Sequence, residues 1–210
     1  MKTIGIVGFG GLGQQLYKLL VEEEYQPKQI VIFDDYLEKQ IGLNVKPFQD
    51  YKKYDRSINY IIALGYKQLK LKSGILEELR NNNCSLYTYI HPTAFISKSA
   101  KIGGSSMVFS GSIIEQNVEL SDGCICYYRT TVSHDCYIGQ STFLAPSVTV
   151  CGNVNIGSNC FIGAGTIVGN GIKIGGNVKI GMQSSVQKNI VENSSCIGNP
   201  LKMIDLLVLK

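Results

Sequence analysis

The sequence predicts an α/β domain followed by an all-β domain, a parallel β-helix of hexapeptide repeats. Strand and helix patterns alternate over residues 1–85. Over residues 86–192 the pattern changes, and from Ile96 to Val186 one apolar residue recurs at every sixth position. Neither the 3.6-residue period of a helix nor the two-residue period of a strand produces this spacing. We therefore expect two domains and a C-terminal capping tail over residues 193–210, which leaves the repeat register.

The first domain has the short alternating elements of an α/β fold. Apolar runs bounded by polar and glycine residues predict strands, and amphipathic stretches between them predict helices. The expected strands are 3–7, 30–33, 60–64 and 85–89, and the expected helices are 11–24 and 67–80.

A glycine-rich run lies between the first strand and the first helix. Its glycines let the backbone approach a phosphate closely, and a helix N-terminus favours negative charge. Asp34 and Asp35 end the next strand, where a carboxylate can meet a ribose hydroxyl. The glycines of this run are Gly8, Gly10, Gly11 and Gly13.

Taken alone, this run is typical of an NAD site. The α/β segment ends near residue 90, however, and leaves one mononucleotide-binding half without room for the second. The uridine or thymidine diphosphate of an activated sugar fits this shorter fold better. The alternative is that the glycines only permit tight packing of strand against helix.

The six-residue repeat predicts a triangular prism. Three hexapeptides close one coil, so the repeats form about five coils whose anchors point inward and stack. Glycine often follows the anchor, as at Gly139 and Gly157, and we expect it to serve corners that need a positive φ. The anchors are Ile96, Ile102, Val108, Ile114, Leu120, Cys126, Val132, Ile138, Leu144, Val150, Ile156, Ile162, Val168, Ile174, Ile180 and Val186.

His134 is the strongest catalytic candidate, and it is one of two histidines. It lies two residues after an anchor, where the side chain can stand on the outer surface near a corner. An imidazole can accept the proton of an attacking amine or hydroxyl, and the adjacent Asp135 can orient the ring. One coil of 18 residues further along is Gly152, whose N–H can stabilise an oxyanion. The alternative is a surface histidine without a role. We interpret His91 as structural.

Composition excludes several classes of function. The net charge of +4 arises from 20 basic and 16 acidic residues that form no basic block, so we expect no nucleic-acid partner. The seven cysteines form no CxxC pair and the chain opens on a strand pattern, so we expect reduced thiols in a cytoplasmic protein without a metal. No apolar run approaches the ~18 residues of a membrane span.

These features together resemble one family over essentially the whole chain. Hexapeptide repeats after a short GxGxxG-like α/β domain, with His134-Asp135 inside them and the tail Gly198-Asn199-Pro200-Leu201-Lys202, look like the sialic acid O-acetyltransferase and nucleotide-linked 4-amino-sugar N-acetyltransferase family. The resemblance implies a left-handed β-helix after a Rossmann-like half domain. It also implies a homotrimer, acetyl-CoA in the groove between neighbouring β-helices, and a sugar nucleotide held partly by the N-terminal domain.

The family's residue roles carry over to matching positions. The resemblance implies that His134 is the general base, Asp135 its partner and Gly152 the oxyanion donor. It also implies that Asp34, Asp35 and the loop Gly65-Tyr66-Lys67 lie against the nucleotide sugar. The chain departs from the family at two places. Phe143 replaces a histidine that contacts acetyl-CoA, and Tyr127 replaces an asparagine on the acceptor side.

Small residues on the repeats are candidates for contact with the pantetheine arm of CoA, since they allow close approach. These are Ala145, Gly163, Ala164 and Gly165, together with Gly152 and the departing Phe143. Lys202 can approach the CoA phosphates as a point charge. The turn before Lys202 is equally expected to seal the end of the prism.

The leading hypothesis is acetyl-CoA-dependent N-acetylation of a UDP- or dTDP-linked 4-amino-4,6-dideoxy sugar for a bacterial surface glycan such as O-antigen. Sugar O-acetylation of the sialic acid type is the alternative within enzymes. A non-catalytic β-helix scaffold remains a third hypothesis, which Phe143 supports. An NAD-dependent oxidoreductase rests only on the glycine run.

Overall fold

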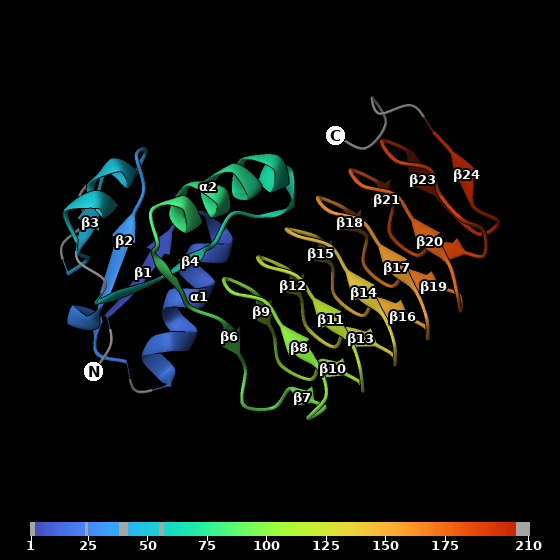
Figure 1. Cartoon of the computed structure of the whole chain (residues 1–210), viewed down its shortest axis with the longest axis horizontal. Coiled ribbons are helices and arrows are strands. Elements are labelled where there is room, and N and C mark those ends of the chain that lie inside the picture. Colours follow the sequence, from blue (N-terminus) through green and yellow to red (C-terminus); the bar gives the residue numbers. More distant parts are fainter. Residues whose placement is uncertain (1–2, 24, 38–41, 55–56, 205–210) are drawn as a thin grey trace. The chain divides into compact units, whose positions relative to one another are not determined.

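The structure is a computed structural model that describes residues 3–23, 25–37, 42–54 and 57–204. The chain divides into two units, Met1–Tyr87 and Thr88–Lys210 (Figure 1). Each unit has its own core and is described separately. Within the described residues, no helix has the length and apolarity to cross a membrane.

The first unit is a parallel sheet with helices α1 and α2 on opposite faces (Figure 1). Its strand order is β3-β2-β1-β4-β5, so the connections run to opposite sides of β1. The strands are β1 Thr3–Val7, β2 Ile30–Phe33, β3 Val45–Lys46, β4 Ile58–Ile62 and β5 Ser85–Leu86. The helices are α1 Gly11–Glu22 and α2 Leu69–Asn81, with short 3-10 turns η1 Pro27–Gln29, η2 Phe48–Lys53 and η3 Tyr66–Gln68.

Several boundaries differ from the sequence expectation. The third predicted strand, 60–64, is observed two residues earlier as β4, because Ile58 is buried and pairs with Thr3 of β1. The predicted strand 85–89 stops at Leu86, and the following Tyr89–Ile90 pair belongs to the second unit. The helix expected over 67–80 begins at Leu69, since a 3-10 turn precedes it. The end of the helix expected at Glu24 lies outside the described residues.

The second unit is a left-handed parallel β-helix with three faces, as expected. Face 1 contains β6 Tyr89–Ile90, β9 Met107–Val108, β12 Ile125–Cys126, β15 Phe143–Leu144, β18 Phe161–Ile162, β21 Lys179–Ile180, β23 Ser195–Ile197 and β24 Lys202–Met203. Face 2 contains β7 Phe95–Ile96, β10 Ile113–Ile114, β13 Thr131–Val132, β16 Thr149–Val150, β19 Ile167–Val168 and β22 Ser185–Val186. Face 3 contains β8 Lys101–Ile102, β11 Glu119–Leu120, β14 Tyr137–Ile138, β17 Asn155–Ile156 and β20 Lys173–Ile174.

The coils repeat in the register that the anchors predict. Val132, for example, pairs with Ile114 on one side and Val150 on the other. From Val108 to Val186 every anchor is at most 2% exposed, whereas Ile96 and Ile102 of the first coil are half-buried. The stacked anchors are therefore the core of the prism, and their burial is its main source of stability.

The corners correct one expectation about glycine. Positive φ occurs at the third residue after an anchor, as at Asn117 and Asp135, both with φ of 58°. The glycine directly after an anchor has a different role: a Cβ on Gly139 would lie 2.6 Å from the carbonyl carbon of Gly157 in the next coil. Glycine is required there because two coils approach closely, rather than because the corner needs a left-handed residue.

The C-terminal end of the prism breaks the repeat. Ile190 bridges to Ile174 and Cys196 pairs with Ile180, so the last coil is two residues shorter than the others. β24 then folds back antiparallel on β23, through a turn in which Gly198 has a φ of 100°. The end of the expected capping tail lies outside the described residues, since 205–210 are not among them.

Candidate active site

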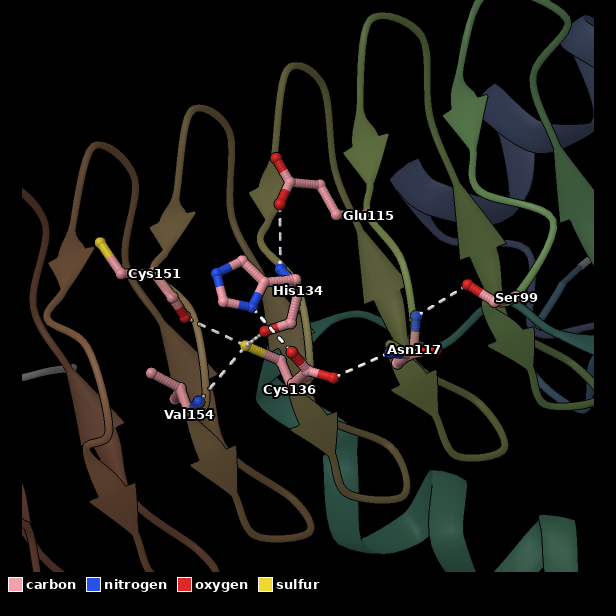
Figure 2. Close-up of polar contacts among 8 residues, drawn as sticks. Ser99, Glu115, Asn117, His134, Cys136, Cys151 and Val154 are labelled. Atoms are coloured by element: carbon pink, nitrogen blue, oxygen red, sulfur yellow. Dashed lines mark hydrogen bonds and ion pairs between the residues drawn. The ribbon is translucent and has the colours of Figure 1, made fainter.

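The histidine candidate lies at the corner where the chain passes from face 2 to face 3. We call this set, Glu115, Asn117, His134, Asp135 and Gly152, the histidine corner (Figure 2 labels Glu115, Asn117 and His134). Its members follow β10, β13 and β16, which are consecutive strands of face 2. Residues 18 apart in sequence therefore meet along one edge of the prism, as the sequence predicts for His134 and Gly152.

A short contact joins His134 to its neighbour. His134 Nδ1 lies 2.8 Å from Asp135 Oδ2, and the two side chains are 45% and 46% exposed. A carboxylate accepts hydrogen bonds, so it favours the tautomer with the proton on Nδ1 and the lone pair on Nε2. Nε2 makes no hydrogen bond to the part of the chain that the structure describes. The ring is thus arranged as an orientated base with its free nitrogen directed away from Asp135.

The second oxygen of Asp135 is also engaged. Asn117 Nδ2 donates a hydrogen bond of 2.9 Å to Asp135 Oδ1. This bond, and next the bond with His134, lower the pKa of Asp135 below its usual value. The carboxylate is therefore ionised at neutral pH.

The backbone on either side of the ring is fixed as well. The His134 N–H donates to Glu115 Oε2 at 3.0 Å, and the His134 carbonyl accepts from the Asn153 N–H. Figure 2 shows the bond between Glu115 and His134, while Asp135 contacts the imidazole at Nδ1. Two acidic residues therefore hold one histidine, one at its backbone and one at its ring.

Gly152 lies directly against the imidazole. A Cβ at Gly152 would be 2.7 Å from both Cε1 and Nε2 of His134, so only glycine lets the ring occupy this position. Within the described residues the Gly152 N–H donates no hydrogen bond, while its carbonyl accepts one from the Gly171 N–H. A free backbone donor consequently lies beside the free ring nitrogen.

The nearby cysteine is part of the core. Cys136 Sγ donates to the carbonyl of Cys151 at 3.0 Å, and the Val154 N–H donates to Cys136 Sγ (Figure 2). Burial raises the pKa of the Cys136 thiol, which disfavours the thiolate needed for nucleophilic attack. The histidine corner is therefore suited to base catalysis, with no covalent intermediate at this cysteine.

The predicted cofactor residues other than Gly152, and the predicted substrate residue Tyr127, lie away from the histidine corner. Tyr127, Ala145 and Gly163 follow β12, β15 and β18, at the corner between face 1 and face 2, and Ala164 and Gly165 continue this corner. Lys202 is an exposed residue of β24 on face 1. Face 2 separates this edge from His134, so a single chain does not bring the two sets together.

Phe143 and Tyr127 form one aromatic pair. Their ring centroids are 5.8 Å apart with an interplanar angle of 27°, and Phe161 continues the row at 5.9 Å from Phe143. The two departures from the family pattern are thus neighbours, which the spacing in sequence did not reveal.

A cavity of about 670 Å³ lies in the first unit, at the carboxyl ends of β1, β2 and β4. This is the point where the connections of a doubly wound sheet diverge, the usual ligand position of such folds. Most of the substrate residues predicted in this unit line it, namely Gly8, Gly10, Gly11, Asp34, Asp35, Gly65, Tyr66 and Lys67. Gly13 does not line the cavity; its Cα packs against the carbonyl oxygen of Gly8, where a Cβ has no room.

The two aspartates have a structural task that sequence did not indicate. Both oxygens of Asp34 accept backbone N–H bonds, Oδ2 from Phe9 at 2.7 Å and Oδ1 from Tyr36 and Leu37. Asp35 Oδ1 accepts from the Phe48 N–H at 2.8 Å. Asp34 therefore ties the glycine loop to the loop after β2, and Asp35 Oδ2 accepts no hydrogen bond from the residues that the structure describes.

Tyr36 is a cavity residue that sequence analysis missed. Its side chain is 97% exposed and borders the cavity together with Phe48 and Leu71. An aromatic residue directly after the Asp34-Asp35 pair was the available signal. Among the described residues no group of three or more His, Cys, Asp or Glu side chains is arranged to hold a metal ion.

Comparison with known proteins identifies the class of this chain. A family model, Bacterial transferase hexapeptide (six repeats), matches residues 135–170. The acetyltransferase domain of PglB from Neisseria gonorrhoeae FA1090 is 25% identical, with 97% of this chain and 100% of that domain covered at a TM-score of 0.89. The chain is a hexapeptide-repeat acyltransferase.

Two more solved structures share the fold of this acyltransferase. PerB from Caulobacter crescentus, whose structure holds CoA and GDP-perosamine, is 24% identical over 98% of both chains at a TM-score of 0.87. WeeI from Acinetobacter baumannii AYE is 20% identical, covering 97% of this chain and 100% of its own, also at 0.87. These matches extend over the α/β unit as well as the β-helix.

Proposed function

We propose that this acyltransferase transfers the acetyl group of acetyl-CoA to the 4-amino group of a nucleotide-linked 4-amino-4,6-dideoxy sugar. The product serves the synthesis of a bacterial surface glycan, such as O-antigen, in the cytoplasm. The observation that carries the proposal is the His134 ring, held by Asp135 and packed on Gly152. A relative, the same PglB domain, has been solved in complex with acetyl coenzyme A, at 25% identity.

The histidine corner supports direct transfer. The amine nitrogen attacks the thioester carbonyl carbon while His134 Nε2 takes the proton that the amine loses. The carbonyl oxygen becomes negative, and the Gly152 N–H is the donor that stabilises it. The C–S bond then breaks, the sulfur leaves with its electron pair, and the imidazolium returns its proton to the sulfur. Asp135 stabilises the imidazolium throughout, because its carboxylate stays ionised.

We infer that acetyl-CoA contacts the corner between face 1 and face 2. Backbone groups at Ala145, Gly163, Ala164 and Gly165 permit close approach by the pantetheine arm, with Phe143 beside them and Lys202 placed for the phosphates. His134 lies on the next edge of the prism, so a second copy must supply one of the two edges. A homotrimer of prisms satisfies this requirement and is part of the proposal.

The cavity of the first unit is the proposed site of the nucleotide. Backbone N–H groups of Gly10 and Gly11 begin helix α1, where an anionic diphosphate is favoured. No side chain caps this helix and its first turn contains no acidic residue. The free oxygen of Asp35 suits a ribose hydroxyl, and Lys67 adds a positive charge at the rim. Tyr127 remains the candidate for contact with the acceptor sugar.

Two alternatives are discriminated by substrate. The histidine corner also suits O-acetylation of a sugar hydroxyl, as in the sialic acid type. The scaffold hypothesis predicts no turnover at all.

The experiment is thiol release from acetyl-CoA against a panel of acceptors. The panel contains UDP-, dTDP- and GDP-linked 4-amino sugars, free sialic acid, and a 4-hydroxy analogue of each nucleotide sugar. Release with an amino sugar supports the proposal, and release only with hydroxyl acceptors supports O-acetylation. Absence of thiol release with every acceptor counts against both N-acetylation and O-acetylation and supports the scaffold hypothesis.

A pair of histidine variants tests the mechanism. His134→Ala is expected to reduce kcat by about 10² to 10⁴, the range for a positioned base, with the fold intact. His91→Ala is the matched control, since His91 Nδ1 only bonds Thr93 in the first coil. Equal activity of both variants would refute the role of His134.

A further inference from the structure

We propose that Asn117 is a positioning residue of the transfer reaction, whose side-chain amide fixes the Asp135 carboxylate in the orientation that aligns His134. The inference rests on the proposed role of His134 as base. It adds a residue from the preceding coil that lies outside the residues matched by the family model.

His134 and Asp135 are both nearly half exposed, and an exposed pair alone holds its geometry weakly, because water competes and both side chains rotate. A general base must lie within hydrogen-bond distance of the proton that it accepts. His134 is therefore oriented well only if a second hydrogen bond fixes Asp135.

Asn117 supplies that hydrogen bond. Its Nδ2 donates to Oδ1 of the same carboxylate whose Oδ2 faces His134 Nδ1, at 2.9 Å and 2.8 Å respectively (Figure 2). With both oxygens bound from different directions, the carboxylate cannot rotate about the Cβ–Cγ bond without breaking one of the bonds. The ring orientation is thereby determined from the coil below.

Asn117 is itself immobilised. Its N–H donates to Ser99 Oγ at 3.0 Å, one further coil down, and its φ of 58° is the left-handed conformation that asparagine tolerates well. Ser99, Asn117 and Asp135 are each 18 residues apart and stack along one edge of the prism (Figure 2). Three coils thus form one polar ladder that ends at the base.

An amide suits this task because it does not titrate. It bonds the Asp135 carboxylate, beyond which His134 lies; Glu115 is two residues before it in sequence, and Lys98 is next to Ser99 in sequence. Donation from Nδ2 lowers the pKa of Asp135, so the carboxylate stays ionised at every pH above that lowered value. Loss of the amide raises this pKa again, toward the ordinary value.

The test begins with Asn117→Ala and a matched control, Asn177→Ala. Asn177 is also the third residue after an anchor and has a φ of 57°, but it lies at the corner between face 3 and face 1. Both variants lose an asparagine from a left-handed position, so strain is equal. Asn117→Ala is expected to reduce kcat about tenfold, as for one lost hydrogen bond to a charged group, with KM for both substrates unchanged. Asn177→Ala is expected to keep full activity.

Asn117→Asp supplies a readout that a structural role would not change. The new carboxyl would face Asp135 and share a proton with it, since two adjacent carboxylates do not both ionise easily. When protonated it can donate as the amide does, and when ionised it repels Asp135. Activity relative to wild type should therefore be highest at acid pH and fall as pH rises, whereas the deficit of Asn117→Ala should be constant with pH.

The outcomes separate this inference from the proposed function. The inference is wrong if the wild type acetylates an acceptor and Asn117→Ala has the same kcat. It is also wrong if the activity of Asn117→Asp, divided by that of the wild type, is constant with pH. If the wild type is inactive with every acceptor, the proposed function fails. The hydrogen bond between Asn117 and Asp135 can then still be tested by carbon-13 NMR titration of the Asp135 carboxyl. Its pKa must rise in Asn117→Ala and stay unchanged in Asn177→Ala.

Discussion

Gly152→Ala separates activity from stability at the histidine corner. The new Cβ would lie 2.7 Å from Cε1 and Nε2 of His134, well inside the 3.4 Å at which ordinary contact begins. One of the two groups must move by somewhat less than about 1 Å. The backbone of Gly152 is held by its neighbouring coils, while the ring is 45% exposed, so the ring moves toward solvent.

A displacement of this size is small for folding and large for catalysis. Misplacing a reacting group by about 1 Å can reduce the rate about 10²-fold. We expect a reduction of kcat/KM of that order, made larger if the Cβ also blocks the oxyanion at the Gly152 N–H. Folding loses only an exposed contact with Asp135, and Gly152 does not have a left-handed φ, so alanine fits its backbone. The Tm is expected to change by less than about 3 °C.

The assay is thiol release from acetyl-CoA, with thermal unfolding of the same preparation. The matched control is Gly176→Ala. Gly176 is also the second residue after an anchor, but its Cβ would meet only Ser158 O at 3.4 Å and Ser158 N at 3.9 Å. The reasoning is refuted if Gly152→Ala keeps more than half of the wild-type kcat/KM. It is also refuted if the Tm of this variant falls so far that unfolding explains its whole loss of activity.

Two further predictions concern glycines that face backbone. Gly157→Ala should destabilise the β-helix by about 2 kcal/mol, since its Cβ would lie 2.6 Å from the Gly176 nitrogen and the coils must separate; urea unfolding measures this, and unchanged stability would contradict it. Gly13→Ala should disrupt the glycine loop, because its Cβ would collide with the Gly8 carbonyl, and calorimetry should detect loss of UDP, dTDP or GDP binding. Gly10→Ala, with nothing within 4 Å of its Cβ, is the folding control for Gly13→Ala.

Sequence predicted the β-helix well because its signal is redundant. A single hexapeptide could arise by chance, but an unbroken series of anchors can only be satisfied by a structure in which every sixth residue points inward. The same regularity placed Gly152 beside His134 through the 18-residue coil. Applied in the other direction, it would also have placed Asn117 beside Asp135, so the signal for the further inference was present in the spacing.

Elements of the first unit were predicted less accurately because local patterns there are short. β3 contains two residues, Val45–Lys46, and no periodicity can indicate so short a strand. β4 was placed two residues late because Leu64 continues the apolar run, although pairing with β1 ends at Ile62. The role of Asp34 was also beyond sequence, since a carboxylate that follows a strand can meet a ribose or backbone N–H groups, and only the fold decides between them.

The stacked pair of Tyr127 and Phe143 changes how the two departures from the family pattern are interpreted. Considered separately, each removes one polar contact, and Phe143 then supports a scaffold without turnover. Because the two rings pack on each other and Phe143 is only 7% exposed, the two departures form one aromatic contact that is largely buried. That contact belongs to the corner between face 1 and face 2, while Asp135, Asn117 and Gly152 still surround His134 on another edge. Under the proposed mechanism the change therefore leaves the groups around His134 in place, and we expect its consequences at the corner between face 1 and face 2.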